Sequence, residues 1–278
     1  MELTDRDTLV KILKNYKIFL KKSLGQNFLV NKKIIEKIVE AGNVTKSDVV
    51  LEIGAGIGTL TRELAKYVYK VIAVEIDKRF EEILKESLKE FSNVELIFDD
   101  ILKIELSKIV TTPYKIFGNL PYYISGTFLG EYLKKGPYAQ TMVLLLQKEM
   151  VERITSKHGT KNFSPLSILL SLMYDFEIIT PVPAHFFFPI PEVDSLLVKF
   201  SYNPKNQSIK NPELFYKLIK SAFKFRRKYL INNLKSEFRN IPWEDIFSKL
   251  NINLKERAEN IPIDVYIKIS NLVEEYGI

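Results

Sequence analysis

The sequence predicts an α/β protein with a mostly parallel, Rossmann-like sheet followed by a small all-helical part. Two observations support this prediction. Short apolar runs alternate with helical patterns up to about residue 200, which is typical of βαβ units. After residues 201–207 the pattern contains only helices and is richer in Lys and Arg. We therefore expect an N-terminal basic segment at 1–22, a sheet domain at 23–203 and a small helical domain at 204–278.

The N-terminal part is predicted to contain a Lys-rich amphipathic segment, a loop and a capped helix. The amphipathic segment ends at residue 22, and residues 22–31 form the loop. Asn31 is suited to cap the next helix, because its side-chain oxygen can accept a hydrogen bond from a free backbone N–H. Gly42 is expected to end that helix.

The sheet is predicted from a plan of strand, turn and helix that occurs twice and then continues with further strands. A glycine turn joins the first strand, 49–53, to a helix that begins near Gly58. In the second unit a helix runs to about Phe91. Later segments are assigned by their apolar character, with a helix at 127–135, helical patterns in VERI and LSILLSLM, and strands at 71–74, 94–98, 114–117, 141–147, 176–183 and 194–200.

The charge of the chain suggests a polyanionic partner. The formal net charge is +7 and the pI is about 9.2. Residues 205–278 hold 14 Lys and Arg against nine Asp and Glu, and residues 1–50 hold 10 against six. Positive charge at both ends favours nucleic acid, although a merely basic surface explains the totals equally well.

The composition excludes several kinds of site. Without cysteine, the chain has no disulfide, no thiolate metal site and no Cys nucleophile. Two histidines, His158 and His185, are too few for a His-rich metal site, and we predict no bound metal. The N-terminus is rich in acids, unlike a transit peptide, and no apolar run reaches membrane-spanning length. We therefore expect a cytoplasmic protein that makes no contact with a membrane.

Polar residues follow four of the predicted strands and indicate a nucleoside site. EIGAGIG (52–58) gives G-x-G-x-G rather than the G-x-G-x-x-G of dinucleotide-binding proteins. Glu75 ends the second strand, where a carboxylate can reach a ribose diol, Asp99 and Asp100 end the third, and Asn119 ends the fourth. Strand ends meet at one edge of a parallel sheet. Acids there repel phosphates, so a positively charged nucleoside such as S-adenosylmethionine is favoured.

Longer segments resemble the KsgA/RsmA-type rRNA adenine N6,N6-dimethyltransferases from about residue 22 to residue 258. The matching segments are GQNFL (25–29), EIGAGIGTLT (52–61), VEID (74–77), FGNLPYYIS (117–125), LLLQKEMVERI (144–154), GTKNFSPLS (159–167), FFFPIPEVDSLLV (186–198) and AFKFRRKYLINNL (222–234). The resemblance implies an S-adenosylmethionine-dependent methyltransferase sheet with a small helical domain. It implies cofactor contacts at Gln26, Asn27, Leu29, Gly54, Glu75, Ile76, Asp100, Ile101 and Asn119.

The segment GNLPYY (118–123) is expected to position the target base. Asn119 can accept a hydrogen bond from the adenine amino group through its side-chain oxygen, and the Leu120 carbonyl can accept another. Pro121 stiffens the loop, and Tyr122 offers a face for stacking. The resemblance suggests Phe187 as a second aromatic wall. We also expect the small Gly118 to leave room for the first methyl group before the second transfer.

The resemblance further implies that the substrate is small-subunit rRNA, free or in a pre-30S particle. We expect two adjacent adenosines in the 3′-terminal hairpin loop to be dimethylated by a monomeric enzyme. RNA contacts are expected at basic residues in the helical domain and near the N-terminus, namely Lys224, Arg226, Arg227, Lys228, Lys21 and Lys22. A solvated face is the alternative for each of these lysines and arginines.

The sequence departs from the family pattern at a few positions. Ser164-Pro165 stands where Gly-Arg is usual, and Asp99, Tyr123 and Gly126 are also unusual. We expect altered local contacts, including the loss or displacement of one basic RNA contact.

Three other functions remain as alternatives. The first is a 23S rRNA methyltransferase of the antibiotic-resistance type, and the second is a ribosome-assembly factor that binds RNA without catalysis. The third, an NAD-dependent oxidoreductase, lacks both the glycine spacing and a hydride-transfer site.

Overall fold

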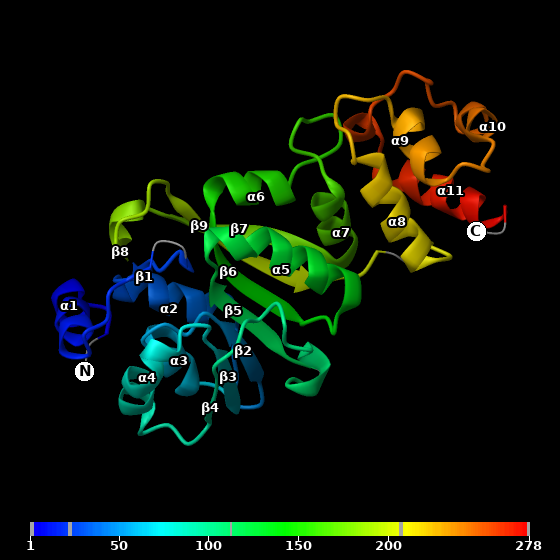
Figure 1. Cartoon of the computed structure of the whole chain (residues 1–278). Helices are drawn as coiled ribbons and strands as arrows, with labels where there is room; N and C mark the ends of the chain where they lie inside the picture. The colour runs from blue at the N-terminus through cyan, green and yellow to red at the C-terminus, as the bar shows by residue number, and fades with distance from the viewer. Residues whose placement is uncertain (1–2, 22–23, 112, 206–207, 277–278) are drawn as a thin grey trace. The chain divides into compact units, whose positions relative to one another are not determined.

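The computed structural model describes residues 3–21, 24–111, 113–205 and 208–276. The chain divides into two compact units. Unit 1 is Met1–Val151 with Asp175–Tyr202, and unit 2 is Glu152–Tyr174 with Asn203–Ile278. Figure 1 shows strands in unit 1 and helices in unit 2. The α/β class predicted for the chain is confirmed.

The chain passes from unit 1 to unit 2 between residues 202 and 203, one residue from the predicted boundary at 203/204, but residues 152–174 also belong to unit 2. The cause is apolar packing: Phe163, Ile168 and Leu172 are buried in the same hydrophobic cluster as Leu218 of the C-terminal helices. Ser164 caps helix α7 (Pro165–Met173), and its side chain and that of Ser167 bond each other's backbone N–H. The unusual Ser-Pro pair therefore has a local structural role, as a cap followed by a proline in the first turn.

Unit 1 contains a seven-stranded sheet in the order β4-β3-β2-β5-β6-β9-β7. The pairs from β4 to β6 are parallel, and β9 runs antiparallel to β6. Strands β9 and β7 are neighbours at one end of this order. The strands are β2 (Val49–Ile53), β3 (Lys70–Val74), β4 (Val94–Ile97), β5 (Lys115–Asn119), β6 (Thr141–Gln147), β7 (Tyr174–Val182) and β9 (Ser195–Tyr202).

Both faces of the central strands are buried, which explains their continuous apolar sequences. On one face, Val50, Val71 and Phe117 share a hydrophobic cluster with Ile38 and Leu64 of the helices. The helices of unit 1 are α1 (Arg6–Asn15), α2 (Lys32–Ala41), α3 (Thr59–Ala65), α4 (Glu81–Leu88), α5 (Tyr122–Lys135) and the beginning of α6 (Lys148–Ile154).

Helix α2 begins as predicted but ends for a different reason. The side chain of Asn31 accepts a hydrogen bond from the N–H of Ile34, which confirms the cap. Gly42 follows α2 with a φ of −74°, so no left-handed conformation requires glycine there. Instead, a Cβ at Gly42 would lie 2.2 Å from the ring of Phe117. Close packing of the helix end on β5 therefore requires the glycine.

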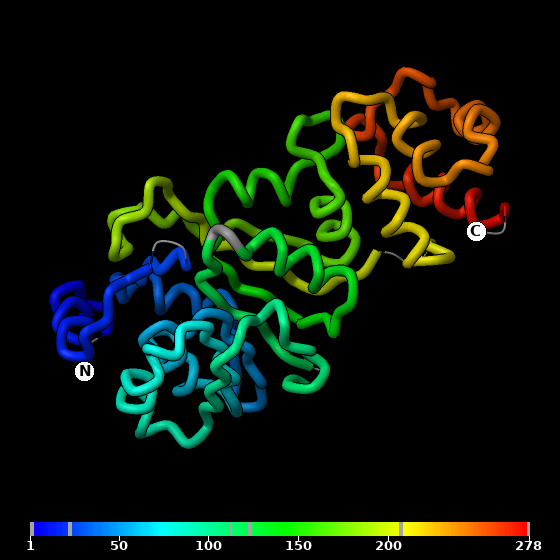
Figure 2. Tube along the Cα trace, in the orientation of Figure 1, coloured from blue at the N-terminus to red at the C-terminus, as the bar shows by residue number. Residues whose placement is uncertain are grey.

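The strand order reverses between β2 and β5. The carboxyl end of β2, which leads into the glycine turn, therefore lies beside the carboxyl end of β5, which carries Asn119. The chain runs outward through β3 and β4 and then returns to the other side of β2, a path that can be followed in Figure 2. Ligands of open α/β sheets bind at such a switch point, outside the carboxyl ends of the strands. A two-stranded ribbon of β1 (Phe28–Leu29) and β8 (Phe187–Phe188) forms a separate small sheet.

Unit 2 is helical and has its own core. Trp243 and Tyr266 are fully buried in it. Its helices are α7, α8 (Pro212–Ala222), α9 (Leu230–Glu237), α10 (Trp243–Lys249) and α11 (Ile263–Glu274). Among the described residues of the whole chain, no helix combines the length and apolar character that crossing a membrane requires.

Candidate active site

A pocket lies at the carboxyl edge of β2, β3, β4 and β5 in unit 1. Its empty volume is about 1000 Å³, part of it continuous with solvent, which suits a nucleoside-sized ligand. The pocket is lined by every residue that the sequence predicted to contact a cofactor: Gln26, Asn27, Leu29, Gly54, Glu75, Ile76, Asp100, Ile101 and Asn119. Pro121 and Glu52 line it as well.

The glycine turn after β2 has a backbone that only glycine adopts easily. Gly54, Gly56 and Gly58 have φ values of 83°, 58° and 86°, in the left-handed region. A Cβ on Gly56 would also lie 2.9 Å from the ring of Phe28. Space as well as conformation therefore requires glycine where the turn meets the N-terminal segment.

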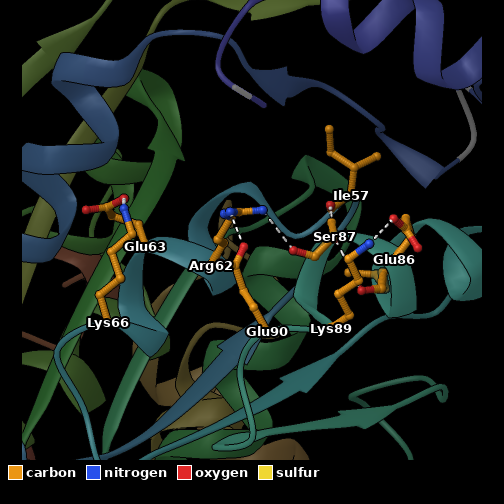
Figure 3. A network of polar contacts seen from close by, with 9 residues as sticks. Ile57, Arg62, Glu63, Lys66, Glu86, Ser87, Lys89 and Glu90 are labelled. Atoms are coloured by element: carbon orange, nitrogen blue, oxygen red, sulfur yellow. Dashed lines mark hydrogen bonds and ion pairs between the residues drawn. The ribbon is translucent and has the colours of Figure 1, made fainter. Parts of the chain in front are cut away.

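Contacts from α3 and α4 hold the glycine turn from behind. Ser87 Oγ donates a hydrogen bond to the Ile57 carbonyl over 3.1 Å, and Arg62 donates to the Ser87 carbonyl over 3.0 Å. Figure 3 shows these contacts together with the ion pair between Arg62 and Glu90. Contacts with α3 and α4 therefore hold the glycine turn in place without any contact from a ligand.

Glu75 ties the second strand end to the glycine turn. One carboxylate oxygen accepts the N–H of Gly56 over 2.7 Å and the other accepts the N–H of Asp77 over 2.9 Å. The side chain is 6% exposed, and burial raises its pKa above the ordinary value. The carboxylate that was predicted to bind a ribose diol also orients the turn beneath it.

Glu52 is a second buried acid of the pocket. It is 1% exposed, and its Oε2 has no hydrogen-bond partner among the described residues. Burial, together with the nearby charge of Glu75, raises the pKa of Glu52 to about 8. The glycine cradle and the other acids that line the pocket, Glu75, Asp99 and Asp100, fit a ligand that brings hydroxyl donors and positive charge, as S-adenosylmethionine does.

The N-terminal segment 19–29, here called the strap, borders the pocket and is tied to the end of β3. Gln26 donates to Asp77 Oδ2 over 2.7 Å and accepts the N–H of Lys21 over 2.8 Å. Arg79 donates to Asp77 Oδ1 over 2.8 Å and to the Phe19 carbonyl over 2.8 Å. Gln26 therefore uses both ends of its amide within the protein, although it also lines the pocket.

Asp77 is the centre of this connection, and the sequence analysis did not identify it as a site residue. Hydrogen bonds from Arg79 lower the pKa of Asp77 to about 2, and the residue is 6% exposed. The available signal was the pair Asp77 and Arg79 directly after the predicted ribose-binding acid. Its other partner, Gln26, is 51 residues away in sequence, so the connection to the strap became evident only in the structure.

Asn119 lies where the strap meets the end of β5. Its Nδ2 donates a hydrogen bond to the Asn27 carbonyl over 2.8 Å. Because the amide nitrogen is engaged by that carbonyl, Oδ1 is the end that remains to accept a hydrogen bond from a ligand. The strap thus fixes the orientation of the amide that was predicted to bind the target base.

The rest of the GNLPYY segment is partly described. Leu120 is 1% exposed, and its N–H bonds the Leu145 carbonyl. Pro121 precedes α5, in which Tyr122 is the first residue, but the side chains of Tyr122 and Tyr123 lie outside the described residues.

Gly118 has a structural reason to be glycine. A Cβ there would lie 2.8 Å from the Ile53 carbonyl. The close approach of β5 to its neighbour β2 therefore requires a glycine, and its role in leaving room for a methyl group stays a prediction.

The structure does not place Phe187 as an aromatic wall. Phe187 pairs with Leu29 in the β1–β8 ribbon and is 2% exposed. Its ring belongs to the hydrophobic core of unit 1 and does not line the pocket. The reason is strand alternation, which turns Phe187 inward while Phe188 lies beneath the guanidinium of Arg6, 5.2 Å from its ring centroid.

The predicted RNA-binding residues of unit 2 lie on the turn between α8 and α9, here called the basic turn (223–229). Lys224, Arg227 and Lys228 are exposed. Arg226 is exposed as well, but it also donates hydrogen bonds to the carbonyls of Lys161 and Phe163, over 2.7 and 3.3 Å. It therefore connects the basic turn to the loop before α7.

The remaining predictions concern the strap and metals. Lys21 is exposed, and Lys22 lies outside the described residues. Within the part of the chain that the structure describes, no three His, Cys, Asp or Glu side chains gather as a possible metal site.

Comparisons with known proteins agree with the predicted resemblance. The family model described as Ribosomal RNA adenine dimethylase matches residues 19–275. The chain is 35% identical to the Ribosomal RNA small subunit methyltransferase A of Clostridioides difficile (strain 630), over 98% of this chain and 96% of that protein. The resemblance identified from the motifs is confirmed.

Solved structures show the same fold. A dimethyladenosine transferase from Plasmodium falciparum matches with a TM-score of 0.75 and 26% identity, covering 89% of this chain and 98% of that one. The 23S rRNA methyltransferase ErmE matches with a TM-score of 0.66 and 22% identity, covering 89% and 99%. The second similarity concerns the fold alone.

Proposed function

The chain belongs to the ribosomal RNA adenine dimethylase family, and we propose that it dimethylates N6 of two adjacent adenosines in the 3′-terminal hairpin loop of small-subunit (16S) rRNA. Two methyl groups on each of two adenosines consume four molecules of S-adenosylmethionine. The choice of the small subunit is supported by relatives at about 35% identity that are named for it.

The orientation of Asn119 carries this proposal. Its amide lies at the end of β5, on the wall of the pocket, with Nδ2 engaged by the strap and Oδ1 left to accept a hydrogen bond. S-adenosylmethionine supplies the methyl group when it is bound. Glu75 and the glycine turn would hold the ribose and amino-acid parts, and Asp100 and Ile101 would border the adenine.

Asn119 overcomes the weak nucleophilicity of the adenine amino group, whose lone pair is delocalised into the ring. In the first transfer Oδ1 accepts one N6–H hydrogen bond and the Leu120 carbonyl accepts the other; in the second transfer one N6–H remains to be accepted. These bonds turn the lone pair out of conjugation and toward the methyl carbon. No strong base is needed for the attack, so positioning supplies most of the acceleration, for which well-oriented groups gain about 7–11 kcal/mol.

The target base must leave its stack before it can reach the pocket. Pro121 restricts the backbone at the entrance to α5, with φ −54° and ψ 142°. Tyr122, the next residue, supplies the stacking face in this proposal. Phe187 is no longer assigned to the base because it is buried in the core.

Substrate binding uses the exposed cations of the strap and the basic turn. Lys21, Lys224, Arg227 and Lys228 are the proposed phosphate contacts. We place the protein in the cytoplasm as a monomer that acts on rRNA within a pre-30S particle.

Two alternatives predict different outcomes. A large-subunit rRNA methyltransferase would use the same pocket, and the fold similarity to ErmE does not distinguish the two substrates. A ribosome-assembly factor without catalysis would bind the cofactor and RNA but transfer nothing; the oriented Asn119 amide argues against it.

The deciding experiment is mass spectrometry of rRNA incubated with the protein and labelled S-adenosylmethionine, with the Asn119→Ala variant alongside. Dimethyladenosine in the 3′-terminal loop of 16S rRNA, absent with the variant, is the expected result. Label on 23S rRNA would support the resistance-type alternative. Cofactor binding without label on either RNA would support the assembly factor.

A further inference from the structure

An exposed aromatic ring lies on the basic turn of unit 2. Phe225 is 46% exposed, whereas Phe223, two residues earlier, packs against the core of the unit with its ring 6.0 Å from that of Phe163. Packing in the core explains why Phe223 is aromatic, but it does not explain the exposed ring of Phe225.

Two ammonium groups gather around the Phe225 ring. Lys228 Nζ lies 4.5 Å from the ring centroid and Lys224 Nζ lies 5.9 Å from it. An exposed cation–π contact is weak, so a ligand can displace either amine from the ring. The amines then remain beside it, where the phosphates of a stacked nucleotide would lie.

The turn that presents Phe225 is held by inward hydrogen bonds. The fully buried Asn233 donates to the carbonyls of Ala222 and Phe225, over 2.7 and 3.1 Å. The N–H of Lys228 donates to the same Phe225 carbonyl over 3.0 Å. Together with the two bonds from Arg226 to the loop before α7, these contacts fix the backbone, so binding does not have to order it.

We propose that Phe225 is a stacking platform for an unpaired RNA base, and that Lys224 and Lys228 bind the phosphates on either side of that base. A flat ring beside two exposed ammonium groups matches a single-stranded nucleotide, which offers a π-face and flanking charges. In a duplex the bases are stacked on one another and offer the ring no face. The inference rests on the proposed action on rRNA and assigns unit 2 a contact with an unpaired segment of it.

The test compares binding of two RNAs to the full-length protein and its variants. One RNA is a hairpin with an unpaired loop, and the other is a fully paired duplex of the same length. The variants are Phe225→Ala and Phe225→Leu, with Tyr276→Ala as a matched control because Tyr276 is also exposed (44%) but lies outside the basic turn. Melting temperatures check that each variant folds.

Both Phe225 variants should weaken hairpin binding by about 5-fold or more, the lower end of a lost stacking contact. Duplex binding, the salt dependence of hairpin binding and the control should be unchanged. If the Phe225 variants lost equal affinity for the hairpin and the duplex, or lost affinity for neither, the proposal that Phe225 is a stacking platform would be wrong. If the unsubstituted protein bound neither RNA, the proposed function would fail together with this inference.

A fluorescent variant provides a direct readout. The chain has one Trp, Trp243, which is fully buried. Phe225→Trp therefore adds a single exposed indole, which should keep hairpin affinity and lose emission when a base stacks on it. Hairpin binding without any change in Trp emission would contradict stacking at this position even if the affinity data were ambiguous.

Discussion

The cofactor edge of unit 1 and the basic turn of unit 2 are both polar, but they are built in opposite ways. At the edge, Glu52, Glu75 and Asp77 are 1%, 6% and 6% exposed, and Glu75 and Asp77 are held by hydrogen bonds within the protein. On the turn, Arg227 and Lys228 are exposed. The first region is a preorganised site for a small ligand, and the second is a charged surface for a polymer.

The difference determines how each region should respond to substitution. A buried hydrogen-bonded group costs much to disturb, because its partners lose their own bonds in a site without water. An exposed cation contributes one of many similar phosphate contacts, each of which depends on salt. Substitutions at the cofactor edge should therefore change rate or cofactor affinity sharply, while those on the turn should change RNA affinity gradually.

The largest effect is expected for Asn119→Asp. Aspartate keeps an oxygen that can accept the N6–H bond but loses the Nδ2 donor that the Asn27 carbonyl holds. The carboxylate is repelled by that carbonyl, so the acceptor leaves its position. The single-turnover rate of methyl transfer should fall by at least about 100-fold, since a small misplacement of a catalytic group can cost that much.

Asn27→Ala is the matched control for this change. It removes the Asn27 side chain but keeps the main-chain carbonyl that accepts the bond from Asn119. The rate at saturating cofactor should stay within a few-fold of the unsubstituted protein, while the KM for cofactor rises. An Asn119→Asp enzyme as fast as the unsubstituted one would show that the orientation of the amide is unimportant.

The next effect is expected for Asp77→Asn, which weakens the connection between the strap and β3. Its charge-assisted bonds with Arg79 and Gln26 are worth about 1.5–3 kcal/mol each, reduced here because the Arg79 side chain is 35% exposed. The Kd for S-adenosylhomocysteine should rise about 10-fold. Calorimetry measures that constant, and hydrogen exchange of residues 24–29 should become faster.

Two further observations sharpen this prediction. Because the pKa of Asp77 is lowered to about 2, its stabilising contribution is complete above its unfolded pKa of 3.8 and is lost only as pH falls through 2. The connection should therefore be constant across neutral pH. Glu81→Gln is the control, since Glu81 forms an ion pair with the exposed Lys85. If hydrogen exchange in the strap of the Asp77→Asn variant were unchanged, the connection between Asp77 and the strap would not be what sets the affinity for the cofactor.

The sheet could be predicted from the sequence because its buried strands are continuous apolar runs. The strand at 141–147 was predicted with the bounds that the structure gives, and residues 49–53 likewise. The β1–β8 ribbon could not be predicted, since two-residue strands carry no periodic signal. Phe187 belongs to this ribbon and is 2% exposed, so its burial could not be predicted either.

The pocket residues could be predicted because strand ends in a parallel sheet lie at one edge, whatever their separation in sequence. The partners of those residues could not. Gln26 and Asp77 are 51 residues apart, and no local pattern joins them. The place of α7 in unit 2 could not be predicted for a similar reason, because α7 is apolar like the sheet but buries Ile168 among helices of unit 2.

The smallest effects should come from the basic turn, where two neighbouring arginines provide a direct comparison. Arg227→Gln removes an exposed charge and should lower the slope of log K against log salt for RNA binding by about 1, with an unchanged melting temperature. Arg226→Gln removes two hydrogen bonds to the carbonyls of Lys161 and Phe163. At about 1 kcal/mol per bond, it should lower the melting temperature of unit 2 by a few degrees. Equal melting temperatures for the two variants would mean that Arg226 is a surface cation like its neighbour, and that its bonds to the loop before α7 do not stabilise the basic turn.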